Sequence, residues 1–112
     1  MLIGQVGRVS ETRLAQELNA RLRPASGAMA GAKGDMSTKH VLIEAKSTTA
    51  RSMTLQHDWL AKIAGEARDA AKVPALIVSF TNGAGKALPS GHWAMIPLQQ
   101  FQDYMLWLEE RE

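Results

Sequence analysis

Two carboxylates and one ammonium group in the first half of the chain have the types and spacing to hold a divalent metal against a phosphate. Glu44 and Lys46 directly follow a short apolar Val-Leu-Ile run, and Asp35 precedes a polar stretch. Side chains alternate faces along a strand, so Glu44 and Lys46 point the same way. A turn centred between Lys39 and His40 would place Asp35 directly opposite Glu44, with Cβ atoms roughly 5 Å apart.

Two carboxylates this close repel each other unless a cation lies between them. Hard oxygen ligands suit Mg²⁺, with Mn²⁺ able to substitute, and Lys46 could orient a water or neutralise charge on phosphate oxygens. The same three residues on an exposed strand would be ordinary solvated charges. However, an apolar run that leads directly into charges is typical of a buried strand that emerges into a site.

The composition indicates one domain, residues 1–112, in which no linker is visible. The chain has no cysteine, which excludes a disulfide framework, a thiolate metal site and a cysteine nucleophile. Its three histidines have no ligand spacing, so a zinc site is not expected. The amino terminus is too short and glycine-rich for a signal peptide, and no apolar stretch approaches the ~20 residues that span a bilayer. A cytoplasmic protein without membrane contact is expected.

The net charge of +2 is unevenly distributed. Residues 1–51 hold eight Lys/Arg against four Asp/Glu, whereas residues 52–112 hold five against seven. An excess of positive charge around the candidate site fits a polyanionic partner such as DNA, bound through phosphate contacts. The candidate DNA-binding residues in this half are Arg8, Arg13, Arg23, Lys33, Lys39 and Arg51.

The order of elements predicts an α/β fold with one mixed sheet between helices. Ser10 is expected to cap a first helix, with Glu11 in its first turn, that Pro24 and Gly27 end. The small residues of 25–34 suggest a short strand and a loop. The hairpin follows, and then come a helix of four to five turns over residues 55–71, strands at 74–80 and 93–96, and a helix over 99–110.

The last helix is apolar around most of its circumference, through the run Tyr-Met-Leu-Trp-Leu of residues 104–108. Such a helix is expected to pack against a partner as well as against the core. The full predicted order is helix, strand, strand, strand, helix, strand, strand, helix.

This arrangement, with an acidic residue opening one strand and Glu-x-Lys closing the next, resembles the PD-(D/E)XK nuclease superfamily. It is most similar to the archaeal-type Holliday junction resolvases and their phage-encoded relatives, over about residues 8–97. The matching segments are Glu11, residues 23–28, Gly34-Asp35, residues 43–47, and residues 74–80 followed by Trp93. Gly34 stands where the proline of the superfamily name is found, and the spacing from Asp35 to Glu44 is shorter than in typical archaeal resolvases.

The resemblance implies a restriction-endonuclease-like core and roles for individual residues. Asp35, Glu44 and the carbonyl of Ala45 would bind Mg²⁺, Glu11 would complete the acidic cluster, and Lys46 would assist the attacking water. Gln56, at the start of the second expected helix, matches a polar position in some branches of the superfamily and is a further candidate DNA-binding residue. Ser26 would contact the region of the scissile phosphate, although a turn or strand-end hydroxyl is an equally good interpretation of it. The implied reaction is hydrolysis of DNA to a 5′-phosphate and a 3′-hydroxyl, by a homodimer that matches the two-fold symmetry of a four-way junction.

Two other hypotheses remain open at this point. A nuclease of the same superfamily could act on other branched DNA or on DNA ends. Alternatively, a DNA-binding module could keep the scaffold without catalysis, but paired carboxylates facing a polyanion would then only repel it.

Overall fold

The computed structural model describes residues 3–22 and 35–111, which form three helices and five strands. In chain order they are α1 (Ile3–Leu18), β1 (Arg21–Leu22), β2 (Met36–Ser37), β3 (Val41–Thr48), α2 (His57–Asp69), β4 (Val73–Thr81), β5 (Ala87–Met95) and α3 (Leu98–Glu110). The predicted order of helices and strands is confirmed. The strand expected within residues 25–34 lies outside the described residues, as do Pro24 and Gly27, and β1 comes before them.

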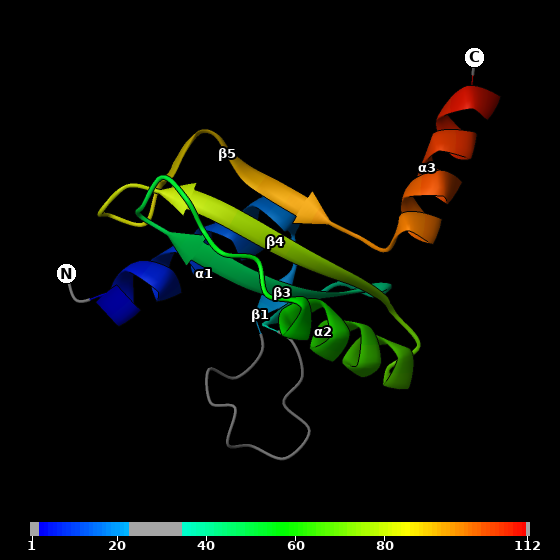
Figure 1. Ribbon diagram of the computed structural model, residues 1–112, viewed down its shortest axis with the longest axis horizontal. Coiled ribbons are helices and arrows are strands. Elements are labelled where there is room, and N and C mark those ends of the chain that lie inside the picture. Colours follow the sequence, from blue (N-terminus) through cyan, green and yellow to red (C-terminus); the bar gives the residue numbers. More distant parts are fainter. Residues whose placement is uncertain (1–2, 23–34, 112) are drawn as a thin grey trace.

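The five strands form one mixed sheet in the order β1-β2-β3-β4-β5. β3 and β4 are parallel and joined by the α2 crossover, whereas all other neighbours are antiparallel. Figure 1 shows α1 behind the sheet and α2 in front of it. Two buried clusters match these layers: Leu14, Ala15, Met36, Ile43, Ala75 and Ile77 on the α1 side, and Leu42, Ile63 and Ala67 on the α2 side.

The predicted register of the β2–β3 hairpin is confirmed. Met36 pairs with Ile43 and Ser37 with Leu42, which centres the turn between Lys39 and His40. The position of Asp35 differs from the prediction, because the ladder ends at the Met36–Ile43 pair and the main-chain amide of Asp35 also donates to the Ile43 carbonyl, at 2.8 Å. Asp35 is therefore an extra residue beside Ile43 and is not paired directly with Glu44. Because a slip of one residue would turn every side chain of a strand to the other face, burial of Met36 and Ile43 against α1 holds this register in place.

The prediction for the start of the first helix is wrong. α1 begins at Ile3, so Ser10 is a buried residue within the helix and Glu11 lies in its middle, with no acidic residue in the first turn. The early turns pack closely against the β4–β5 turn: a Cβ added to Gly85 would lie 2.9 Å from the Val6 carbonyl oxygen. Tertiary contact therefore outweighs the weak helix propensity of the glycines there.

The end of α1 also comes earlier than predicted. Asn19 has a φ of 54°, and the amide of Ala20 donates to the carbonyl of Ala15 at 2.8 Å. A residue in the left-handed region followed by such a hydrogen bond is a common way for a helix to end. Asn is the non-glycine residue that tolerates this conformation best.

The remaining boundaries differ by smaller amounts. α2 has 13 residues, or about 3.6 turns, and is therefore shorter than the expected four to five turns. The left-handed Ala71, with a φ of 55°, follows its end. β5 begins at Ala87, six residues before the expected start. α3 has the expected span, but none of its residues is buried, so the expectation that it packs on the core is wrong.

No helix within residues 3–22 and 35–111 is long and apolar enough to cross a membrane.

Gly91 lies in an irregular part of the β4–β5 pair, where the register shifts between Ser79 and Thr81. A Cβ at Gly91 would lie 2.5 Å from the Phe80 carbonyl oxygen and 2.7 Å from that of Leu88, and these backbone atoms cannot rotate away. Gly91→Ala should therefore destabilise the fold by about 1–3 kcal/mol in chemical denaturation. Gly83→Ala is the matched control, because its Cβ would meet nothing within 4 Å. Equal stability of the two variants would contradict this account of the bulge.

Candidate metal-binding and catalytic site

The candidate site lies at the edge of β3, where the short strand β2 begins. The carboxylate of Asp35 accepts a hydrogen bond from the main-chain amide of Ala45 at 2.7 Å. The amide and carbonyl of one strand residue point to the same edge, because paired residues exchange both hydrogen bonds. The carbonyl of Ala45 therefore points toward the edge at which the Asp35 carboxylate lies.

Glu44 approaches from the α2 face and is only 7% exposed. Its carboxylate forms an ion pair with Lys46, with 3.6 Å between Oε1 and Nζ. Burial, and next the nearby charge of Asp35, raise the pKa of Glu44 above its ordinary value. The ion pair with Lys46 and the charge of Lys62 offset part of this rise.

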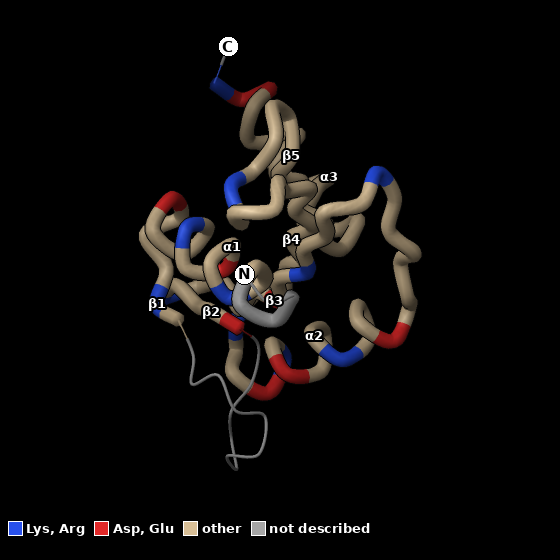
Figure 2. Tube along the Cα trace, turned by 90° about the vertical axis from the view of Figure 1, so that its left-hand side faces the viewer, with Lys and Arg blue, Asp and Glu red and all other residues tan. Residues whose placement is uncertain are grey.

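Glu11 joins the cluster from α1. Its pKa is also raised, first by burial and then by the charge of Asp35, with a further contribution from Glu44. Arg8, whose guanidinium lies 3.9 Å from the Glu11 carboxylate, acts in the opposite direction. Carboxylates from α1, from the segment before β2 and from β3 are thus in electrostatic range of one another, and Figure 2 shows acidic and basic positions interspersed around α1 and near the start of β2.

Trp59 is a candidate site residue that the sequence analysis did not assign to the site. The ammonium of Lys46 lies 4.7 Å from the centre of the Trp59 ring and 3.6 Å from the Glu44 carboxylate. An aromatic face attracts a cation and restricts the positions the ammonium can take. Trp59 is therefore well placed to orient Lys46.

The contact between Trp59 and Lys46 was indicated by the spacing of residues in the sequence. A step of four residues along a helix covers about 6 Å, and a step of two residues along a strand covers about 6.6 Å, so successive positions on one helix face can lie over successive positions on one strand face. α2 returns antiparallel to β3 after the crossover, which aligns one helix face with one strand face. Ala67 and Ile63 pack on Leu42, and the next position on the same helix face, Trp59, then reaches Lys46.

The acidic side chains of the site could hold a magnesium ion only together with other ligands, namely a main-chain carbonyl, waters and substrate phosphates. Among the described residues, no group of three or more His, Asp or Glu side chains is arranged to hold a metal. Mg²⁺, however, is usually held by one or two carboxylates together with waters and substrate phosphates. Asp35, Glu44 and the carbonyl of Ala45 offer such a set. Burial and then the charge of Asp35 raise the pKa of Glu44, and a cation between the two carboxylates would stabilise both charged forms.

The candidate DNA-binding residues do not all lie near this cluster. Arg8 does, through its ion pair with Glu11. Lys39 occupies the hairpin turn at the opposite end of β3, and Arg13 lines a separate polar cavity between α1 and β5. Arg51 and Gln56 are exposed in the segment between β3 and α2, where Gln56 is the residue before the helix. Ser26, Arg23 and Lys33 lie outside the described residues.

A serine–histidine–glutamate chain elsewhere in the fold has a structural role. Ser79 Oγ lies 2.7 Å from His92 Nδ1, and His92 Nε2 lies 3.2 Å from the Glu17 carboxylate. Ser79 is 1% exposed, so no substrate reaches its hydroxyl. The chain satisfies a buried hydroxyl and ties β4 and β5 to α1.

Comparisons with protein-family models, with curated proteins and with solved structures give no match for this chain.

Glu44 should make the metal-free protein less stable as the pH rises. Its folded-state pKa is raised, so the native state binds the proton more tightly than the unfolded state does. Stability is therefore gained as pH falls through the raised pKa toward the ordinary value and is lost as pH rises through the same window. Glu44→Gln should raise the melting temperature at neutral pH and flatten its dependence on pH.

The matched control is Glu109→Gln, an exposed carboxylate on α3. It should leave the pH profile of the melting temperature unchanged. If the melting temperature of Glu44→Gln depended on pH as that of the wild type does, the pKa of Glu44 would not be raised by folding.

Proposed function

We propose that the protein is a magnesium-dependent, structure-specific DNA endonuclease that cleaves four-way junctions and acts as a homodimer. The observation that carries the proposal is the arrangement at the β3 edge. There, the Asp35 carboxylate and the Ala45 main chain meet beside Glu44, and the ammonium of Lys46 lies 3.6 Å from the Glu44 carboxylate. Acidic ligands with an adjacent lysine are suited to phosphodiester hydrolysis.

Each residue has a separate role in this proposal. Bound Mg²⁺ would supply Lewis-acid stabilisation of the charge on the phosphate oxygens. Asp35, Glu44 and the carbonyl of Ala45 would hold it, and Glu11 would add negative charge from α1. Lys46 would hold the attacking water by a hydrogen bond and stabilise negative charge as the water oxygen bonds to phosphorus. The water would give up one proton to bulk solvent, the bond from phosphorus to the 3′ oxygen would break, and the 3′ oxygen would take up one proton from solvent.

The fold supports the same proposal at a coarser level. A mixed sheet between helices, in which an antiparallel hairpin is followed by a parallel crossover, provides the framework expected of a restriction-endonuclease-like core. In this framework β3 is an inner strand that carries Glu44 and Lys46, while β2 brings Asp35 alongside. Function is argued from the site, because one fold can host many activities.

A nuclease that acts on other branched DNA or on DNA ends is the second candidate. It shares the site and differs in the substrate that the surrounding surface accepts. A binding module without catalysis is disfavoured by Glu44, because a buried carboxylate with a raised pKa is costly to keep next to a polyanion.

Asp35→Asn and Glu44→Gln should each lower Mg²⁺-dependent cleavage of a four-way junction by at least about 100-fold, because each removes a charged ligand. Junction binding should stay equal or become tighter, since one negative charge facing the phosphates is lost. Cleavage is measured on labelled junctions with Mg²⁺, and binding is measured in Ca²⁺ or without metal.

The matched controls make the same chemical changes on α3, as Asp103→Asn and Glu109→Gln. They should cleave as the wild type does. A four-way junction, a fork and linear duplex are offered in parallel, so that nicking of the junction alone supports a resolvase and equal attack on all three supports a general nuclease. Unchanged cleavage by Asp35→Asn or Glu44→Gln would refute the site assignment.

Trp59→Leu should lower the cleavage rate about 2–5-fold, the loss expected for a half-exposed cation–π contact of ~0.5–1 kcal/mol. Trp59→Phe keeps an aromatic face and should retain most of the rate. Because Trp59 acts through Lys46, its effect should disappear in a Lys46→Met background. An additive loss in the double variant would contradict the positioning role.

A further inference from the structure

α3 presents an apolar stripe that nothing in the described chain covers. Phe101, Tyr104, Met105 and Leu108 follow the i, i+3, i+4, i+7 spacing of one helix face. They are 46%, 49%, 44% and 44% exposed. Gln99 and Asp103 lie on the opposite side together with the exposed Leu106, so the stripe is the most continuous apolar part of a helix that is apolar around most of its circumference.

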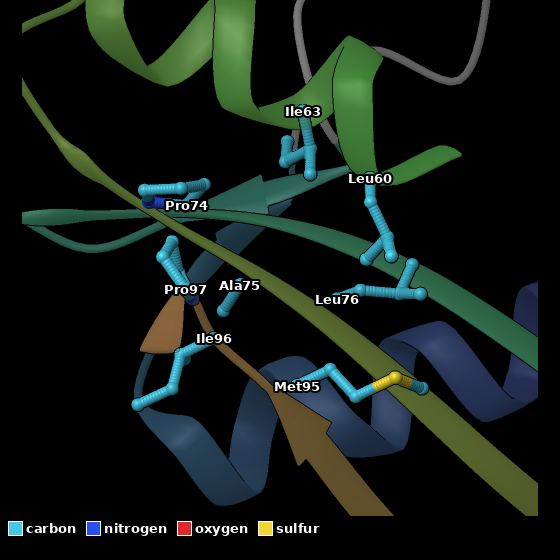
Figure 3. Close-up of a pocket in the computed structure, with 8 residues that line it drawn as sticks. All are labelled: Leu60, Ile63, Pro74, Ala75, Leu76, Met95, Ile96 and Pro97. Carbon is cyan, nitrogen blue, oxygen red and sulfur yellow. The ribbon is translucent and has the colours of Figure 1, made fainter. Parts of the chain in front are cut away.

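The same chain also contains an apolar groove of about 270 Å³. α2 contributes Leu60 and Ile63, and the rest of the lining comes from β4, the end of β5 and the two residues that lead into α3. Figure 3 shows the α2 side chains pointing across the groove toward Leu76, with Met95, Ile96 and Pro97 along the other side. Every residue that lines the groove is apolar, so it offers no hydrogen bond to orient a polar ligand.

The groove is more suitable for side chains than for a small molecule. Its volume lies below the roughly 300–1,000 Å³ of ordinary ligand pockets, and such pockets include a few polar groups that fix orientation. Two or three aliphatic or aromatic side chains from a helix would fill it. An apolar helix face laid in an apolar groove is a recurrent mode of protein recognition.

The helix of the same copy is poorly placed to fill this groove. Only Ile96 and Pro97 separate β5 from α3, and both line the groove themselves. Pro97 is extended, with φ −55° and ψ 145°, and Figure 1 shows α3 directed away from the sheet. The chain would have to reverse within these two residues for α3 to lie over its own groove.

We propose that two copies of this chain exchange their α3 helices, each apolar stripe lying in the groove of the other copy. One chain carries both complementary surfaces, joined by a short connection, and this is the situation in which identical elements are swapped between subunits. A 13-residue helix has a footprint of roughly 20 Å by 10 Å, so two exchanged helices and the two grooves that receive them would bury about 800 Å² of projected area in total, toward the small end of specific interfaces. The inference specifies how the proposed homodimer forms and does not depend on nuclease activity.

The first test compares oligomeric state by sedimentation at micromolar concentration. Wild type should be a dimer, and Met105→Glu combined with Leu108→Glu should weaken dimerisation at least 10-fold. Gln99→Glu combined with Gln102→Glu adds the same charge outside the stripe and should have no effect. In the groove, Ile96→Glu should weaken the dimer equally, whereas Leu88→Glu, an exposed position on β5 outside the groove, should not. Circular dichroism and the melting profile confirm that each variant is folded.

The second test uses the absence of cysteine from the chain. Copies that carry Ile96→Cys are mixed with copies that carry one cysteine at Phe101, Tyr104 or Leu108, and oxidised. Helix exchange predicts a disulfide between the two kinds of copy at one of these positions at least, and none with Gln16→Cys on α1. A monomeric wild type, absence of any cross-link, or a dimer that Ile96→Glu leaves intact would overturn the proposal. The last outcome would indicate that the α3 helices pair with each other. Junction cleavage by a monomeric wild type would leave the nuclease proposal standing.

Discussion

The hydrogen bond from the Ala45 amide to the Asp35 carboxylate is the interaction on which the site depends. It fixes the first acidic residue at the edge of β3 and holds it beside Glu44. The bond exists only in the observed register of β2 and β3, which burial of Met36 and Ile43 enforces. Packing on the α1 face of the sheet therefore determines the position of charges at its edge.

The cluster also costs stability. Burial and mutual repulsion raise the pKa of both Glu11 and Glu44, so their charged forms are disfavoured in the folded protein. Lys46 offsets part of this effect, and Trp59 holds its ammonium close to Glu44. A strained group of carboxylates at the edge of a well-packed sheet is common where a protein binds a cation or performs acid–base chemistry. The two helices are therefore part of the site: α1 supplies Glu11, and α2 supplies Trp59.

The sequence predicted the parts of this structure that local rules determine. The hairpin register followed from the polar turn and the alternation of faces, and the order of elements followed from hydrophobic periodicity. The start of α1 was not predictable in this way, because its early turns are in close contact with Gly85, a residue far away in the sequence. The left-handed Asn19 did give a local signal for the end of the helix, but Pro24 and Gly27 were stronger breakers. The apolar residues of α3 indicated burial, yet composition alone does not tell which surface covers a helix.

We propose that Asp35, Glu44 and the Ala45 carbonyl share one divalent cation, and a crystal structure with Mn²⁺ can locate it by anomalous scattering, independently of any assay. One peak is expected at the β3 edge, within about 2.0–2.3 Å of oxygen atoms from all three residues, and it should be lost in Glu44→Gln. A metal bound elsewhere, or no peak at this edge at saturating Mn²⁺, would contradict this proposal.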